Sequence, residues 1–254
     1  MGFNIAVAGK GGTGKTTVTG LMLRHLVGLN RGRVLAVDAD ANMNLNEVLG
    51  LGVHQTIGQI REGLGTVPQG MTKDAYINYR TQECLIEGEG FDLIAMGRPE
   101  GAGCYCYANT LCKKYVDEMA DNYRYVVLDN EAGMEHLSRR TTHNMDVMFA
   151  VTDSSVRGIQ AAGRIRDLVA ELKLSIGKMA LIINRVPDGE LQDATKTEIE
   201  RLGLELAGVV PNDPNIYQFD LEGKATFLLP EDSPAVKTVA EILEQYLDGE
   251  ESAA

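Results

Sequence analysis

Short, continuously apolar runs recur along the chain, and segments with apolar residues at helical spacing separate them. Such runs are typical of strands buried on both faces of a parallel sheet. They predict strands at residues 3–8, 33–38, 91–97, 125–128, 147–152, 179–186 and 207–210. The helical spacing predicts helices after residue 15, from Asn109 to 119, at 159–172 and at 234–247. Strands that alternate with helices in this way predict an α/β fold.

The length of 254 residues is enough for one large α/β domain, and no break in composition indicates a second. We therefore predict a single domain over residues 1–248, with a mostly parallel, doubly wound central sheet flanked by helices. Residues 249–254 are a short acidic tail that we expect to be disordered.

The stretch from Leu49 to Gly90 is the least informative part of the chain. It holds short helical patterns at 56–64 and 73–85, which several glycines interrupt. We interpret it as a variable crossover that offers room for a partner surface. Cys84 lies in it beside apolar residues, which favours a buried structural thiol.

A glycine-rich loop follows the first predicted strand and opens the first predicted helix. It satisfies the motif G-x-x-x-x-G-K-[ST] and reads Gly9-Lys10-Gly11-Gly12-Thr13-Gly14-Lys15-Thr16-Thr17. In this motif backbone N–H groups face phosphate oxygens, the lysine (Lys15) reaches the β- and γ-phosphates, and the next hydroxyl (Thr16) can ligate Mg²⁺. The sequence therefore predicts a P-loop NTPase that binds ATP or ADP, with a plain glycine-rich turn as the alternative.

Carboxylates end two of the predicted strands, where ligands bind in open α/β sheets. Asp38 and Asp40 follow the second strand, and Asp129 ends the fourth, with Gly133 four residues further on. This placement lets Asp38 and Asp129 hold Mg²⁺ through water and lets Asp40 orient or deprotonate the attacking water. The Gly133 N–H can sense the γ-phosphate. Alternatively, Asp38 and Asp40 only cap a helix or form a turn.

Cys104 and Cys106 lie in a glycine-rich loop that we predict to run from Arg98 to Tyr107. Cysteines two residues apart cannot easily bridge each other, but both can direct a thiolate at one soft metal ion. Two ligands are too few for a tetrahedral site, and a two-fold dimer would bring four together. The alternative is a pair of incidental loop cysteines. Cys112 fits core packing better than service as an extra ligand.

The formal net charge of −12 argues against a broad nucleic-acid footprint, which needs clustered Lys and Arg. No apolar run is long enough to cross a membrane, and the N-terminus lacks the pattern of a signal peptide. The last predicted helix carries Glu241 and Glu244, whereas a membrane-surface helix is typically basic. We expect a cytoplasmic protein without nucleic-acid or membrane partners.

The run from Lys10 to Thr16 resembles the loop of the deviant Walker-A ATPases, which include division-site and chromosome-partitioning ATPases and the nitrogenase iron protein. The resemblance implies a nucleotide-sandwich dimer in which Lys10 crosses to the partner's phosphates. It also implies the hydrolytic role for Asp40, adenine contact by Asn184, and a loop at Pro211 that closes over the base. A solvated charge at Lys10 and a turn-forming Asn184 are the alternatives.

Within that family, the loop, the Cys104-x-Cys106 pair and the run from Asp129 to Leu137 are similar to the nickel-insertion accessory ATPases of carbon monoxide dehydrogenase. This likeness implies an ATP-dependent homodimer that holds Ni²⁺ or Zn²⁺ with both C-x-C pairs and serves that dehydrogenase as its client. The alternative is an iron-sulfur, nitrogenase iron protein-like reductase. His136 holds the place of its second cluster cysteine, so four thiolates would come from Cys104 and Cys106 of two chains.

A cytoskeletal positioning ATPase is the third class considered. Its members would be expected to carry a basic DNA-binding patch or a basic amphipathic C-terminus, and neither is visible in the sequence. They also have no need of a C-x-C loop.

Overall fold

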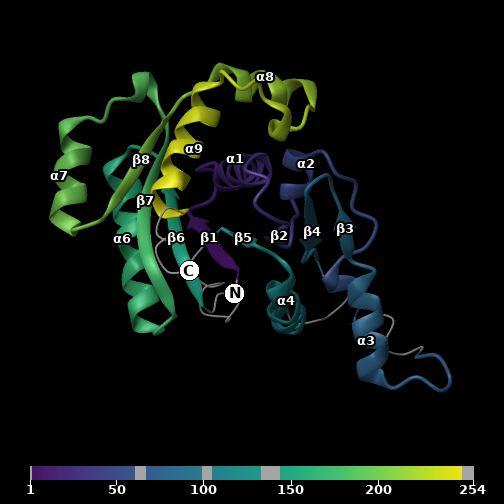
Figure 1. The fold of residues 1–254 in the computed structure, drawn as a ribbon. Helices are drawn as coiled ribbons and strands as arrows, with labels where there is room; N and C mark the ends of the chain where they lie inside the picture. The colour runs from purple at the N-terminus through teal and green to yellow at the C-terminus, as the bar shows by residue number, and fades with distance from the viewer. Residues whose placement is uncertain (1, 61–66, 99–104, 133–143, 248–254) are drawn as a thin grey trace.

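The computed structural model describes residues 2–60, 67–98, 105–132 and 144–247. Its centre is an eight-stranded sheet with the strand order β3-β4-β2-β5-β1-β6-β7-β8 (Figure 1). The strands are β1 (Phe3–Gly9), β2 (Val34–Ala39), β3 (Leu85–Glu87), β4 (Phe91–Ala95), β5 (Tyr125–Asn130), β6 (Met145–Thr152), β7 (Ile176–Val186) and β8 (Leu206–Pro211).

The pairings from β4 through β8 are parallel, and β3 adds to the edge of β4 in the antiparallel sense. β1 lies between β5 and β6, so that Ile5 aligns with Val127 on one side and with Val147 on the other. The chain winds outward from β1 to β2 and β4, returns to β5, and then winds the other way through β6, β7 and β8. The predicted doubly wound, mostly parallel sheet is confirmed.

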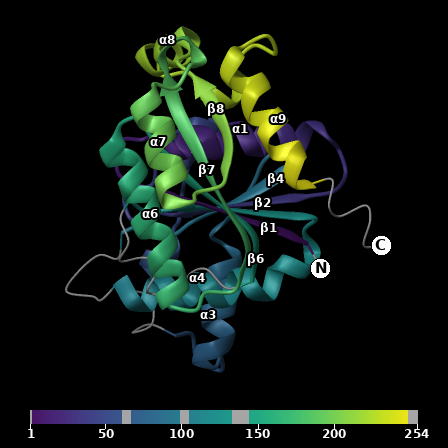
Figure 2. The same cartoon turned by 90° about the vertical axis from the view of Figure 1, so that its left-hand side faces the viewer.

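Helices cover both faces of the sheet (Figures 1 and 2). One face carries α1 (Lys15–Gly28), α2 (Leu45–Leu49) and α9 (Pro234–Leu247). The other face carries α4 (Tyr105–Met119) and α6 (Val156–Glu171), and α7 (Asp193–Leu202) packs beside α6. In the described ranges, the remaining helices are α3 (Lys73–Gln82) and α8 (Pro214–Glu222), with short 3-10 turns that include η4 (Thr226–Leu228).

The core has two main layers, because the strands bury side chains on both faces. Ile5 and Phe149 of the sheet pack with residues of α1 and α9, whereas Leu35 packs with Leu111 of α4 and Ile165 of α6. In the described part of the chain, no helix is long and apolar enough to cross a membrane.

Several element boundaries differ from the prediction: β7 begins at Ile176 and not at 179, and α6 begins at Val156 and not at 159. The helical pattern predicted to reach Leu85 ends at Gln82, and Leu85 begins β3, which pairs with β4 across a short turn. Three residues are too few for a recognisable strand period, so only the pairing defines this strand. The helix expected to start at Asn109 begins at Tyr105 instead. Asn109 is therefore an ordinary helical position and not its cap.

Phe149 offers a test of the packing between sheet and helix. It is fully buried and lies edge-on against Tyr246 of α9, with the ring centroids 5.1 Å apart. We expect Phe149→Ala to lower the free energy of unfolding by about 3–5 kcal/mol, because apolar contacts are lost and a cavity remains. Tyr217→Ala removes a ring that is 68% exposed and should change the free energy of unfolding by less than about 0.5 kcal/mol. Urea unfolding followed by circular dichroism measures both, and equal losses would contradict the assigned core.

Candidate functional site

The predicted phosphate loop connects the central strand β1 to α1 at the carboxyl edge of the sheet. Three of its glycines, Gly9, Gly12 and Gly14, adopt a positive φ. Gly9 has φ +153°, and a Cβ there would lie 2.2 Å from the Val151 carbonyl oxygen of β6. Gly14 has φ +84°, which L side chains rarely adopt. The chain therefore passes from strand to helix through a turn that disfavours a side chain at these glycine positions.

Lys15 begins α1 and is buried within the loop that precedes it. Its Nζ donates to the Lys10 carbonyl oxygen at 3.4 Å, and the Thr13 hydroxyl donates to the same oxygen at 2.8 Å. Burial lowers the pKa of Lys15, while the carboxylates of Asp129, Asp40 and Glu131 act to raise it. The ammonium therefore lies between a loop built for phosphate and a set of acidic groups. The Lys10 side chain is exposed at the start of the same loop.

Asp129 and Asp38 are neighbours at the ends of β5 and β2, where they stand in register. Both are buried. Burial raises the pKa of Asp129 to about 7; the Asp38 carboxylate adds to the rise, and hydrogen bonds from Thr16 and Thr19 oppose it. The Thr19 hydroxyl donates to Asp129 Oδ1 at 3.2 Å. Two buried carboxylates beside one hydroxyl-rich helix start form a set of hard oxygen ligands.

The Asp38 carboxylate also organises the segment that follows β2. It accepts hydrogen bonds at 3.0 Å from the backbone N–H groups of Asp40, Asn44 and Leu45, so it caps the turn that leads into α2. Burial raises the pKa of Asp38, and these three amides act to lower it. Asp40 in turn accepts from the Asn42 N–H at 2.8 Å. Both aspartates therefore make the turn contacts that the alternative interpretation of the sequence predicted. Each carboxylate can still accept a further bond from a ligand.

The end of β7 holds the phosphate loop from the opposite side. Asn184 is buried, and its Nδ2 donates to the Thr13 carbonyl oxygen at 2.9 Å. Arg185 donates from Nη1 to the Gly12 carbonyl oxygen at 3.2 Å. Arg185 adopts φ +57° at an irregularity in the pairing of β7 with β8, and such irregularities redirect side chains.

Sequence reasoning missed Arg185. Its left-handed backbone and its contact with Gly12 arise from strand pairing. No residue pattern signals either feature.

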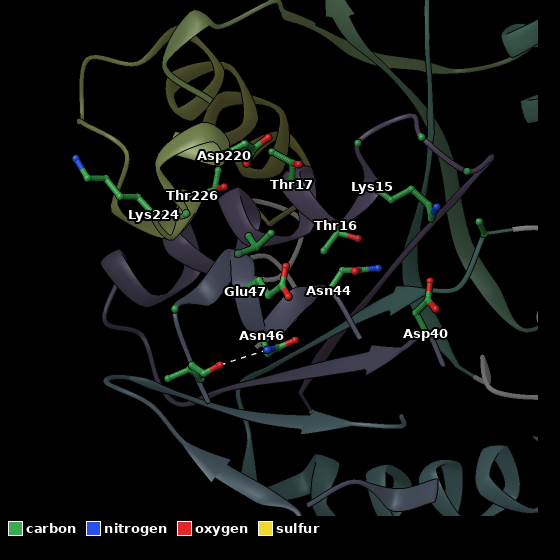
Figure 3. Close-up of a pocket in the computed structure, with 18 of the residues that line it drawn as sticks. Lys15, Thr16, Thr17, Asp40, Asn44, Asn46, Glu47, Asp220, Lys224 and Thr226 are labelled. Atoms are coloured by element: carbon green, nitrogen blue, oxygen red, sulfur yellow. Dashed lines mark hydrogen bonds between the residues drawn. The ribbon is translucent and has the colours of Figure 1, made fainter. Parts of the chain in front are cut away.

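Two adjoining cavities follow this edge of the sheet. The larger one, of about 870 Å³, extends from the phosphate loop to the turn after α8. Figure 3 shows Lys15 and Asp40 at one end of it, with Lys224 and Thr226 at the other. The smaller one, of about 260 Å³, is lined by residues that include Asn184, Pro211, Asn212, Ile216 and Tyr217. The residues predicted to contact phosphate and those predicted to contact adenine thus line neighbouring spaces.

Several predicted site residues fall elsewhere. Gly133, Cys104 and His136 lie outside the described residues. The backbone of Cys106 lies in the first turn of α4, so the loop predicted to reach Tyr107 ends by Tyr105. In the ranges that the structure describes, no three acidic, histidine or cysteine side chains group as a metal site would require.

The other two cysteines are buried, as the sequence predicts. Cys84 and Cys112 both lie in the core layer beneath α4 and α6. Burial raises the pKa of each thiol to about 12. Both are therefore neutral at physiological pH, which suits a packing role.

Comparison with known proteins places this arrangement in a family. Residues 5–227 match the CobQ/CobB/MinD/ParA nucleotide binding domain. The chain belongs to this family, and it is a P-loop ATPase. It is 42% identical over 250 residues to an uncharacterized ATP-binding protein of Methanocaldococcus jannaschii, covering 96% of this chain and 98% of that protein.

Two further likenesses are informative. The carbon monoxide dehydrogenase accessory protein CooC of Rhodospirillum rubrum is 29% identical over 259 residues, with 94% of each chain covered. The crystal structure of the cell division ATPase MinD of Pyrococcus furiosus superposes with a TM-score of 0.70 at 21% identity, covering 98% of this chain and 99% of that one. The second likeness concerns the fold.

Gly14→Ala tests the contact between β7 and the phosphate loop. The added Cβ would lie 2.3 Å from Asn184 Nδ2 and would sit on a backbone with φ +84°. We expect at least a ten-fold loss of ATP affinity in calorimetry, because the loop must shift away from Asn184. Gly28→Ala, at the end of the same helix, meets no atom within 4 Å and should bind ATP as the native protein does. Equal affinities in both variants would show that the contact does not shape the site.

Proposed function

We propose that this ATPase is a dimeric metallochaperone that binds Ni²⁺ or Zn²⁺ through Cys104 and Cys106 of each subunit. In this proposal ATP hydrolysis controls the spacing of the two cysteine pairs, and the client is carbon monoxide dehydrogenase. The observation that carries the nucleotide part is the buried cluster of Lys15, Asp38 and Asp129 beside the phosphate loop. The likeness to CooC over 94% of the chain supports the metal cargo and the client.

Mg²⁺ fits the carboxylate end of the site. Asp129 is buried beside a second carboxylate, and burial raises its pKa to about 7, so a divalent cation would relieve an unfavourable negative charge. Thr16 would hold the ion through its hydroxyl, and Asp129 and Asp38 would hold it through water. When bound, Mg²⁺ neutralises charge on the β- and γ-phosphates.

The protein's own groups would then supply position and proton transfer. Lys15 and the loop amides bind the phosphates. Gly133 N–H is proposed to contact the γ-phosphate, while Asn184 and the backbone at Pro211 hold the adenine. Asp40 lines the larger cavity and orients or deprotonates the attacking water. Lys10, exposed at the loop, would reach the partner subunit's nucleotide across the dimer.

Helix α4 gives a physical route between the nucleotide and the metal cargo. Cys106 is in its first turn, where the helix dipole favours negative charge such as that of a metal-binding thiolate. One turn and a half further along, Cys112 packs into the core layer that contains Ala39, the residue before Asp40. A movement of the Asp40 segment on hydrolysis would therefore reach the core layer on which this helix packs.

Asp40→Ala tests the hydrolytic role. We expect ATP turnover to fall by about 10²–10⁴-fold, the usual contribution of a positioned general base, while ATP affinity changes little. Asp121→Ala, at an exposed position away from the cavities, serves as the matched control. Steady-state phosphate release measures the rate for both. If Asp40→Ala hydrolyses ATP at the native rate, the assigned role is wrong.

Anaerobic metal analysis tests the cargo. After Ni²⁺ loading with ATP, we expect one nickel per two chains in the native protein and none in the Cys104→Ala/Cys106→Ala variant. Light scattering should still show the ATP-dependent dimer in that variant; its loss would mean that the thiols are structural. Iron with acid-labile sulfide in the same sample would replace the proposal with the reductase alternative, and the absence of any thiol-dependent metal would refute both.

A further inference from the structure

Three residues line both of the adjoining cavities: Thr17, Arg185 and Asp220. The phosphate loop lines the larger cavity, and the residues proposed to hold the adenine line the smaller one. In a nucleoside triphosphate the α-phosphate connects the β-phosphate to the ribose and the base. When the terminal phosphates lie at Lys15 and the base lies in the smaller cavity, the α-phosphate therefore lies near the residues that the two cavities share.

The three shared residues differ in the chemistry that they offer to a phosphate. Thr17 brings a hydroxyl, Asp220 a carboxylate and Arg185 a guanidinium. A carboxylate repels a phosphate, whereas a guanidinium presents a planar fork of five N–H donors that matches phosphate oxygens. Within the described ranges, Arg185 has a hydrogen bond to a carbonyl oxygen and no ion pair with a carboxylate. Its positive charge is therefore available to a ligand at the junction of the cavities.

The other two cations that line the cavities lie away from this junction. Lys224 pairs with Glu222, at 2.5 Å between Nζ and Oε2, and Lys15 lies within the loop. Both line the larger cavity but not the smaller one. The carboxylates that line the two cavities are Asp40, Glu47, Asp213 and Asp220. Among these acidic groups, a phosphate at the junction needs a nearby positive charge, and Arg185 is the residue that provides it.

The fold holds the Arg185 side chain against the phosphate loop. Its Nη1 donates to the Gly12 carbonyl oxygen at 3.2 Å, and a Cβ on Gly14 would lie 3.5 Å from both Nε and Nη2. Arg185 adopts φ +57° where the pairing of β7 with β8 is irregular. Backbone strain of this kind is concentrated at ligand-binding positions, where the surrounding structure maintains it. The guanidinium therefore lies beside the part of the loop that leads into α1.

We propose that Arg185 binds the α-phosphate of ATP and ADP. One nitrogen holds the Gly12 carbonyl oxygen, and other N–H donors of the same guanidinium bond to an α-phosphate oxygen. The inference rests on the proposed adenine site in the smaller cavity, and not on the metal cargo. ATP and ADP share the α-phosphate, so this contact stabilises both complexes equally. The Lys15 contact with the γ-phosphate, in contrast, is lost on hydrolysis.

Arg185→Ala tests the contact by calorimetry with ADP and with a nonhydrolysable ATP analogue. We expect both affinities to fall by the same factor, about ten-fold or more, as the loss of a charge-assisted hydrogen bond predicts. Arg185→Lys keeps the charge and should recover part of the loss. Lys173→Ala is the matched control, because Lys173 is an exposed cation with φ +51° that lines neither cavity. It should bind both nucleotides like the native protein.

The two diastereomers of ADPαS separate phosphate binding from a purely structural role of Arg185. Sulfur replaces one α-phosphate oxygen in each, and sulfur is the weaker hydrogen-bond acceptor. We expect the native protein to prefer one diastereomer and Arg185→Ala to lose that preference, so that the ratio of the two affinities falls to about one. The same ratio in both proteins would show that Arg185 only shapes the loop, and it would overturn the proposal. Native affinity of Arg185→Ala for ADP would overturn it as well.

A further variant distinguishes failure of this inference from failure of the proposed adenine site. Asn212 is exposed and lines the smaller cavity alone, so Asn212→Trp would fill part of the space assigned to the base. We expect it to weaken ADP binding by about ten-fold or more, because the base must be displaced. Native affinity of Asn212→Trp for ADP would mean that the base lies elsewhere. The ADPαS ratio would still decide whether Arg185 contacts the α-phosphate.

Discussion

The structure depends on the cost of placing negative charge at the buried carboxyl edge of a parallel sheet. Asp38 and Asp129 stand side by side in neighbouring strands, and both are buried. The groups that offset the negative charge of these two carboxylates are the Lys15 ammonium, three backbone amides and two threonine hydroxyls. These partners leave Asp129 with a pKa of about 7. Such an arrangement costs stability in the free protein and is favourable once a cation and a polyanion bind together.

The phosphate loop beside these charges is fixed in place by β1 and by the end of β7. β1 brings it to the centre of the sheet, and its glycines let it turn at positions where a side chain would clash or be strained. Asn184 and Arg185 at the end of β7 then bond to its carbonyl oxygens, which leaves its N–H groups available for phosphate. Arg185 maintains this contact from a left-handed backbone, which an arginine rarely adopts. These contacts hold the loop in a defined conformation, which is what electrostatic preorganisation of a phosphate site requires.

The same edge of the sheet connects three different surfaces. The segment after β2 carries Asp40, α4 begins at the proposed metal pair and packs on β2, and α8 borders both cavities. The Asp40 segment follows β2, α4 packs on β2, and α8 borders a cavity that the phosphate loop also lines. A switch needs an element whose position both sites influence, and these short connections provide candidates for it.

The sequence by itself determined the strand pattern, the phosphate loop and the class of chemistry. Continuous apolar runs and glycine spacing are local features, and α9 runs over Pro234–Leu247 as its pattern predicts. The tertiary structure alone decided the β3 edge strand, the contacts of Arg185, and the position of Asp129 beside Asp38. Each of these depends on strand pairing or on burial next to a distant residue, and neither quantity has a local period.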